Sequence, residues 1–164
     1  MVPQEVFLLT DRLDRNLSLG RLDAPNEEVI QAAQTAELHD DIEAFSEGYA
    51  TEVGERGITL SGGQRQRAAI ARALIHQGRI LILDDCLSAV DVATERRIIE
   101  HLQQATQRQT TIVISTRLSA VAHADQIIVL EDGSISEHGD HASLLTKGGL
   151  YARLWSEQKE TDSA

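Results

Sequence analysis

The residues best suited to chemistry are a Ser-Gly-Gly-Gln turn at residues 61–64 and an acidic pair, Asp84 and Asp85. Two glycines after a serine can open a helix whose first backbone amides are accessible to a phosphate. The serine and the glutamine also have the spacing of a capping box. The acidic pair ends the apolar run at 80–83, where a carboxylate can hold Mg²⁺ or activate water. Together they indicate nucleoside triphosphate chemistry, although the sequence has no G-x-x-x-x-G-K-[ST] loop.

The elements that must position these residues follow two patterns. Residues 5–75 are predicted to be helices with loops, with Asn26 capping a helix over 27–35 and a longer helix over 61–76. From residue 79 the pattern becomes buried strands at 80–83 and 111–115 around a helix over 92–104. Asp132-Gly133 predicts a hairpin, Asp140 can cap a helix, and a last helix is predicted over 150–157. An α/β fold is therefore expected.

The composition is that of a globular domain and disfavours some functions. The chain has 164 residues, of which 41% are hydrophobic and 25% charged. The formal net charge of −11 disfavours nucleic acid as a partner, because such binding depends on Lys and Arg. The single cysteine, Cys86, is expected to be a small buried residue rather than a reactive thiol. No apolar run has membrane-spanning length, so any membrane role would be by docking.

The residues around the Ser-Gly-Gly-Gln turn extend the pattern into a resemblance. Leu60-Ser61-Gly62-Gly63-Gln64-Arg65-Gln66-Arg67, followed by Ala71-Arg72-Ala73-Leu74, resembles the signature segment of ATP-binding cassette (ABC) ATPases. Further segments match motifs of that family in order and spacing over nearly the whole chain. They are a Q-loop at Val2-Pro3-Gln4, an exporter-type loop at 51–57, a Walker B strand at 80–85, a D-loop at 88–91 and a switch segment at 111–118.

The resemblance implies a P-loop NTPase fold. The chain would hold a RecA-like core without its N-terminal Walker A strands, together with an ABC α-helical subdomain. Residues 1–4 would be the Q-loop entry into the helical subdomain. Residues 5–77 would form that subdomain, including the signature helix, and residues 78–164 would be the C-terminal part of the RecA-like core. Walker A precedes the Q-loop in the family, so we expect a partial chain that binds MgATP weakly and hydrolyses none alone.

The resemblance also implies roles for single residues. Asp84 would hold Mg²⁺ together with Gln4, the Q-loop glutamine. Asp91 would lie at the interface with a second ATPase domain, although by itself it is a good helix N-cap, and both roles are compatible. The signature residues would bind the ATP of that second domain: Ser61, Gly62, Gly63 and Gln64. Arg65, Arg67 and Arg72 are expected to be solvated helix positions rather than a basic patch.

Two departures from the family pattern fall in one implied site. The family usually has Glu where this chain has Asp85, placed to polarise the attacking water. It has His where this chain has Thr116, placed to contact the γ-phosphate. A carboxylate that is one methylene shorter lies about 1 Å from the required position, and threonine cannot carry a proton near neutral pH. We therefore expect a site that binds ATP but hydrolyses it poorly, beside an intact signature.

These expectations combine into one function. The chain resembles the degenerate-site half of a heterodimeric multidrug or lipid exporter, which couples ATP binding and hydrolysis to export. Its partners would be a second ABC ATPase domain and transmembrane domains, at the cytoplasmic face of the plasma (inner) membrane. Two alternatives remain open: a non-catalytic ATP-gated dimerisation module, and a homodimeric exporter with two slow sites. ABC ATPases that act on DNA or ribosomes are disfavoured by the loop at 51–57 and by the absence of basic patches.

Overall fold

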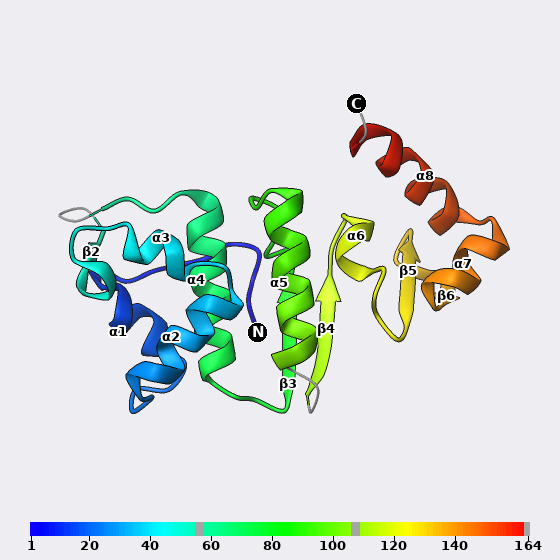
Figure 1. Cartoon of the computed structure of the whole chain (residues 1–164). Helices are drawn as coiled ribbons and strands as arrows, with labels where there is room; N and C mark the ends of the chain where they lie inside the picture. Colours follow the sequence, from blue (N-terminus) through cyan, green and yellow to red (C-terminus); the bar gives the residue numbers. More distant parts are fainter. Residues whose placement is uncertain (55–57, 106–108, 163–164) are drawn as a thin grey trace. The chain divides into compact units, whose positions relative to one another are not determined.

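The computed structural model describes residues 1–54, 58–105 and 109–162 of the chain, which forms two compact units, 1–114 and 115–164. Figure 1 draws the first unit in blue to yellow-green and the second in yellow to red. Each unit contains both helices and strands, which confirms the predicted α/β class. The finer division at residues 4 and 77 stays a prediction.

The first unit begins with short helical elements and ends with strands around a long helix. Its strands are β1 (Asp11–Arg12), β2 (Glu52–Val53), β3 (Ile80–Asp84) and β4 (Thr110–Ile114). Its helices are α1 (Leu13–Ser18), α2 (Asn26–Thr35), α3 (His39–Glu43), the 3₁₀ turn η1 (Gly48–Ala50), α4 (Gly62–Ile75) and α5 (Val92–Ala105).

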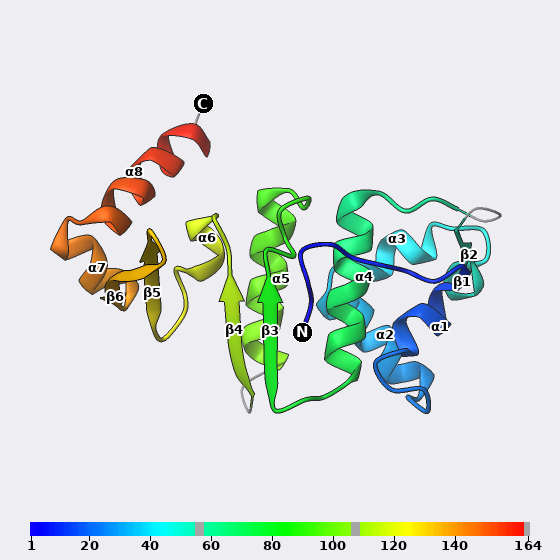
Figure 2. The ribbon, with the colours of Figure 1, turned by 180° about the vertical axis from the view of Figure 1, so that it is seen from behind.

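Strand β3 lies in the middle of the parallel pairing in this unit. It pairs with β4, so that Asp84 lies opposite Ile114. On its other side Val2 forms a parallel bridge with Leu83, and the Asp84 N–H donates to the Val2 carbonyl at 2.9 Å. Neighbouring parallel strands need a crossover connection, which α5 provides. Figure 2 shows β3 and β4 side by side with α5 on one face. The beginning of the chain is thereby fixed beside the strand that carries the acidic pair.

The two strands are less buried than their sequences predicted. Leu81 and Leu83 are buried, but Ile80 is 59% exposed, Ile112 45% and Ile114 51%. These three isoleucines share one face, because side chains alternate along a strand and the register places Ile82 opposite Ile112. Continuous apolar strands are typical of sheets that are covered on both faces. The expectation of burial at 111–115 was therefore wrong for the described residues, whose uncovered face is apolar.

The start of helix α2 corrects another prediction. Asn26 is the first helical residue, and Pro25 takes the N-cap position without a side-chain cap. The Pro25 carbonyl accepts from the N–H groups of Glu28 and Val29 at 3.0 and 3.2 Å. The fixed φ of proline suits this position, so the helix begins one residue earlier than expected. Glu27 lies in the first turn as predicted, next to the positive end of the helix dipole.

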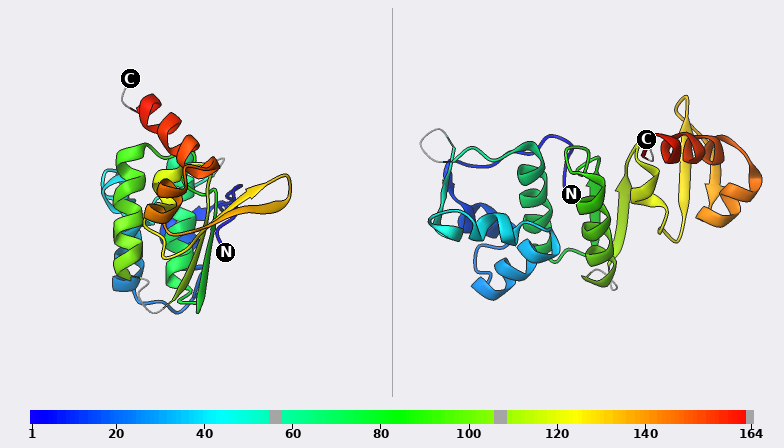
Figure 3. Two further views of the ribbon diagram at one scale, coloured as in Figure 1. Left: turned by 90° about the vertical axis from the view of Figure 1, so that its right-hand side faces the viewer. Right: turned by 45° about the horizontal axis from the view of Figure 1, so that its top comes forward.

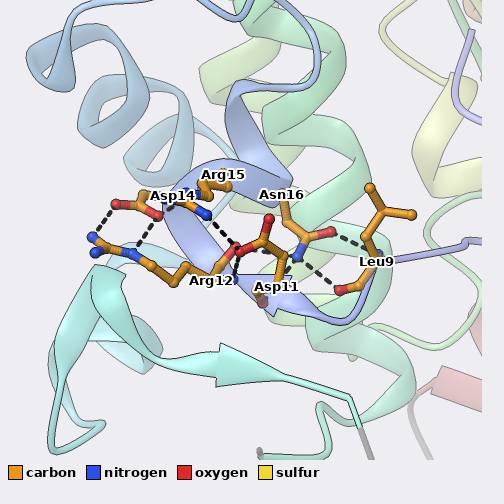
Figure 4. Close-up of polar contacts among 6 residues, drawn as sticks. All are labelled: Leu9, Asp11, Arg12, Asp14, Arg15 and Asn16. Carbon is orange, nitrogen blue, oxygen red and sulfur yellow. Dashed lines mark hydrogen bonds and ion pairs between the residues drawn. The ribbon is translucent and has the colours of Figure 1, made fainter.

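The segment that leads from Gln4 into the helices is held by one buried asparagine. Figure 4 shows Asn16 facing Leu9, with its Oδ1 accepting from the Leu9 N–H at 2.8 Å and its Nδ2 donating to the Leu9 carbonyl at 2.9 Å. The same Nδ2 also reaches the Arg12 carbonyl at 3.1 Å. Asn16 is 1% exposed, so these bonds give the backbone groups of Leu9, which lies outside the helices and strands, a partner in place of water.

Replacing Asn16 by Ala is expected to lower the free energy of unfolding by about 3 kcal/mol, because several backbone groups lose their buried partner at once. Asn26→Ala is the matched control, since Asn26 is exposed and is expected to change stability by about 0.5 kcal/mol or less. Urea denaturation followed by far-ultraviolet circular dichroism measures both. Equal urea concentrations at half-unfolding for the two variants would show that the hydrogen bonds of Asn16 do not stabilise this segment.

The second unit is a hairpin followed by two helices. It contains α6 (Leu118–Val121), β5 (Ile127–Glu131), β6 (Ser134–Gly139), α7 (His141–Lys147) and α8 (Leu150–Asp162). Figure 3 shows the hairpin and the helices that follow it. Asp132 and Gly133 form its turn with φ values of 50° and 74°, as a tight two-residue hairpin requires. The predicted hairpin and final helix are confirmed.

The small core of this unit gathers the aromatic residues of its last helix. Leu118, Ile127, Leu144 and Tyr151 are buried together, and Trp155 packs against them. Asp140 caps α7, with its Oδ1 accepting from the Ser143 N–H at 2.8 Å, as predicted. In the parts of the chain that the structure describes, no helix is both long and apolar enough to cross a membrane.

Candidate functional site

Three of the predicted polar groups meet at the carboxyl end of β3. The Nε2 of Gln4 donates to Oδ2 of Asp85 at 3.1 Å, although the two residues are 81 positions apart. This contact follows from the parallel bridge of Val2 with β3, which carries the chain past the end of the strand two residues later. Asp84 and Asp85 are half-buried and Gln4 is exposed, so all three remain accessible to a ligand.

The backbone of Asp85 has an unusual conformation. Its φ is +46°, in the left-handed region, and its N–H donates to the Ile114 carbonyl at 2.8 Å. Aspartate tolerates this region better than most residues, because its short side chain can bond locally. The hydrogen bond fixes Asp85 to the end of the neighbouring strand. Its carboxylate is therefore held in place from both sides, by its own backbone and by Gln4.

The donors at this strand end suit one kind of metal ion. Within residues 1–54, 58–105 and 109–162, no group of three or more His, Cys, Asp and Glu side chains could hold a metal alone. Mg²⁺ commonly takes one or two carboxylates and fills its other positions with waters and phosphate oxygens. Asp84, next to the Asp85 that contacts Gln4, fits a Mg²⁺ ion that arrives with a triphosphate, and does not fit a closed structural metal site.

The start of α4 has the predicted capping box. The Gln64 N–H donates to the Ser61 hydroxyl at 3.2 Å, and the Ser61 N–H donates to Oε1 of Gln64 at 2.9 Å. The Nε2 of Gln64 also donates to Oδ1 of Asp41 at 3.0 Å. Both ends of the Gln64 amide are thus engaged within the chain. Gln64 therefore fixes the turn, and the backbone N–H groups of Gly62 and Gly63 are left for a phosphate.

A buried glutamine that the sequence analysis did not single out joins α4 to the residues after the acidic pair. Gln66 is 7% exposed; its Nε2 donates to the Ser88 hydroxyl at 3.1 Å and its Oε1 accepts from the Ala89 N–H at 2.9 Å. The Ser88 hydroxyl in turn donates to the Asp85 carbonyl at 2.9 Å. Three hydrogen bonds therefore connect the predicted signature helix with the predicted D-loop and with Asp85.

Replacing Gln66 by Leu is expected to lower the free energy of unfolding by about 1 kcal/mol, since the Ala89 N–H and the Ser88 hydroxyl lose their hydrogen bonds to the Gln66 side chain. The amide hydrogen of Ala89 should also exchange faster with solvent. Gln34→Leu is the matched control, because Gln34 is exposed on α2. Chemical denaturation and native-state hydrogen exchange measure the two effects. An unchanged exchange rate at Ala89 would contradict the contact.

Asp91 acts as an N-cap, as its sequence position predicted. Its Oδ1 accepts from the Thr94 N–H at 2.9 Å, next to the first turn of α5. This hydrogen bond lowers the pKa of the Asp91 carboxyl, because it favours the ionised form. Its implied role at an interface stays a prediction. Residues 51–54 of the predicted exporter-type loop are described, and residues 55–57 lie outside the described residues.

Two arginines of α4 are not the solvated side chains that were predicted. Arg72 donates from Nε to the Asn16 carbonyl at 2.9 Å and from Nη1 to the Phe7 carbonyl at 3.1 Å, and burial lowers its pKa. Arg67 forms an ion pair with Asp41 at 2.7 Å. Both side chains thus join α4 to other segments, and only Arg65 is exposed. The helical pattern alone did not reveal carbonyl groups that arrive from distant segments.

Cys86 and Thr116 complete the set of predicted residues. Cys86 is 2% exposed, and burial raises its pKa to about 12, so it is the predicted small buried residue and not a reactive thiol. Thr116 belongs to the second unit, where its side chain is exposed and its carbonyl accepts from Nε2 of Gln158 at 2.8 Å.

The chain is similar to several curated proteins over almost all of its length. ATP-binding cassette sub-family B member 6 of Homo sapiens is 48% identical over 159 residues, which are 97% of this chain and 19% of that protein. Heavy metal tolerance factor 1 of Caenorhabditis elegans is 46% identical over 96% of this chain and 20% of its own. The mitochondrial potassium channel ATP-binding subunit of Mus musculus is 49% identical over 96% and 22%. The chain therefore spans about a fifth of the length of these relatives.

A solved structure and a family model agree with these relatives. The structure of a bacterial Atm1-family ABC exporter with ATP bound matches with a TM-score of 0.87 and 43% identity, over 96% of this chain and 27% of that one. The family model for ABC transporters matches residues 1–88, which are more than half of the chain and contain the Gln4–Asp85 contact and the whole of α4. By its sequence and its fold, this chain belongs to the ABC transporter family.

Proposed function

We propose that this chain is part of the nucleotide-binding domain of an ABC exporter, which couples ATP binding and hydrolysis to the export of a substrate across a membrane. The observation that carries this proposal is the contact of Gln4 with Asp85 at the end of β3. It brings the implied Q-loop glutamine to the implied Walker B acids. The 43% identity with an ABC exporter whose structure contains ATP supports the same function.

The chain's own site is proposed to hold MgATP and to hydrolyse it slowly. Mg²⁺, when bound, supplies positive charge that neutralises the β- and γ-phosphates. Asp84 would be its protein ligand, and Gln4, at the same end of β3, would be a second one. Asp85 would have to orient the attacking water, but its carboxylate is one methylene shorter than that of glutamate and already accepts from Gln4. Residue 116, the implied switch position, is a threonine, which has no group that titrates near neutral pH. Binding is therefore retained while the groups that act on water and on the γ-phosphate are weakened.

The signature side of the chain is proposed to serve a different ATP. Ser61, Gly62, Gly63 and Gln64 would complete the site of a second ABC ATPase domain that packs head to tail. Because this signature is intact and the chain's own site is altered, a heterodimer with a catalytically competent partner is favoured over a homodimer. Residues 1–4, 5–77 and 78–164 would be the Q-loop entry, the helical subdomain and part of the core. The partners also include transmembrane domains, at the cytoplasmic face of the plasma (inner) membrane.

Photolabelling with 8-azido-ATP in the complete transporter tests the proposed site. Asp84→Asn is expected to reduce Mg²⁺-dependent labelling of this chain by about tenfold, since the loss of one charged ligand weakens binding by about 1.4 kcal/mol or more. Asp125→Asn is the matched control, because Asp125 is exposed and outside the proposed site. Labelling that does not depend on Asp84, or on Mg²⁺, would overturn the proposed function.

Asp85 and Thr116 also favour a second candidate, a non-catalytic ATP-gated dimerisation module. In that case Asp85 and Thr116 would leave this site unable to hydrolyse ATP, and ATP would act only by closing the dimer. Restoring the family's residues at both positions separates the candidates: a slow catalytic site gains activity, and a dimerisation module does not.

A further inference from the structure

The last helix of the chain holds the backbone on both sides of Arg117. The Nε2 of Gln158 donates to the Thr116 carbonyl at 2.8 Å, and its Oε1 accepts from the Leu118 N–H at 2.9 Å. One side-chain amide therefore bonds two backbone groups that lie about 40 residues before it. A second local bond, from the Arg117 N–H to the Ser115 hydroxyl at 3.0 Å, closes the same turn.

The helix that carries Gln158 is a firm support for this contact. Tyr151, Trp155 and Gln158 have the spacing i, i+4 and i+7, so they lie on one face of α8. Tyr151 is fully buried and its hydroxyl bonds Nδ1 of His141 at 2.7 Å, while Trp155 packs against the same core. The amide of Gln158 is thus anchored to the core of its unit. Its position is not that of a mobile surface side chain.

The contact fixes the backbone of Thr116 and leaves its side chain exposed. With the carbonyl of residue 116 and the N–H of residue 118 both bonded, α8 holds the backbone on the carboxyl side of the Thr116 Cα and thereby restricts the direction of its Cα–Cβ bond. A side chain at this position can contact a γ-phosphate only if its backbone is held, because about 1 Å of displacement at a reacting group can reduce a rate by two orders of magnitude.

We propose that Gln158 is a positioning residue for the switch position of this site, so that helix α8 determines where the side chain of residue 116 reaches. This inference rests on the proposed function, in which residue 116 faces the γ-phosphate. It assigns to the last helix a part in nucleotide hydrolysis beyond packing. The hydrogen bonds of Gln158 to the backbone of residues 116 and 118 are present although residue 116 is threonine instead of histidine.

The test uses the complete transporter in which Asp85→Glu and Thr116→His restore the family's residues. Gln158→Met, which keeps the length of the side chain and removes both hydrogen bonds, is added to that parent. We expect the gain in kcat to fall by about tenfold while the KM for ATP changes by less than about threefold, because positioning acts on the reaction and not on binding. Glu160→Met on the exposed side of α8 is the matched control and should keep the gain.

Hydrogen exchange, which does not depend on ATP hydrolysis, tests the role of Gln158 separately from the proposed function. Hydrogen exchange at the Leu118 amide should become about tenfold faster in Gln158→Met, and it should be unaffected in Gln158→Glu, which retains the acceptor and loses only the donor to Thr116. Melting temperatures identify variants that have lost the fold. Unchanged exchange in Gln158→Met, or faster exchange with the full gain in kcat, overturns the role of Gln158. A parent without any gain counts against the proposed slow site, and the exchange rates then decide whether Gln158 holds this segment.

Discussion

The double substitution Asp85→Glu and Thr116→His is expected to raise the rate of ATP hydrolysis at this chain's own site by about tenfold to hundredfold in the complete transporter. General acid–base and orienting groups commonly contribute factors of about 10² to 10⁴ to a rate. The longer carboxylate reaches the position that polarises water, and the imidazole adds a group that can hold a proton at the γ-phosphate. Each single substitution should have a smaller effect, because residues that act as a unit are not additive. Steady-state phosphate release measures the rates.

Two controls match the restored residues. Asp132→Glu places glutamate at another left-handed position, where φ is +50°, and Thr146→His introduces histidine at an exposed helical site. Neither should change the ATPase rate. Asp85→Glu itself is expected to lower the free energy of unfolding by about 1 kcal/mol, because the left-handed conformation at residue 85 suits aspartate better than a longer side chain. No gain in rate in the double variant would favour the non-catalytic module.

The parts of the fold that follow from local chemistry could be predicted from the sequence. The capping residues Ser61, Asp91 and Asp140 each bond an amide in the first turn of the following helix, as their positions indicated. The hairpin at Asp132-Gly133 needs left-handed backbone, which this pair provides. In each case the residue type and the conformation are joined within a few positions, so no knowledge of distant segments was required.

Contacts between distant segments were not predictable in the same way. Gln66, Asn16 and Gln158 are ordinary polar residues of helices, and nothing in their spacing shows that each meets backbone groups from another segment. The exposure of β3 and β4 did not follow from their own sequences for a related reason, since an apolar strand indicates that it is to be covered but not which segment covers it. Side-chain amides that bond the backbone of another segment therefore cannot be recognised from helical spacing.

Gly63→Ala is expected to reduce the partner's ATP hydrolysis by about hundredfold. A Cβ on Gly63 would lie 2.9 Å from the Ala89 carbonyl oxygen, a backbone atom that cannot rotate away. The start of α4 must then move relative to residues 88–90, and a shift of about 1 Å at a phosphate-binding turn can cost two orders of magnitude in rate. Gly78→Ala is the matched control, because the nearest atom, at 3.3 Å, belongs to the His76 side chain, which can move. An unchanged rate in Gly63→Ala would exclude this turn from the partner's site.

The two groups of substitutions are expected to act on different ATP molecules. In a heterodimer, Gly63→Ala lowers hydrolysis at the partner's site, and the double substitution at 85 and 116 raises it at the chain's own site. The effects should therefore be independent when they are combined, because distant sites with no shared partner are additive. In a homodimer every site contains both elements, so Gly63→Ala would remove the gain as well. The rate of the triple variant, compared with that of Gly63→Ala alone, thus distinguishes the two assemblies: a retained gain from the substitutions at 85 and 116 indicates a heterodimer, and a lost gain indicates a homodimer.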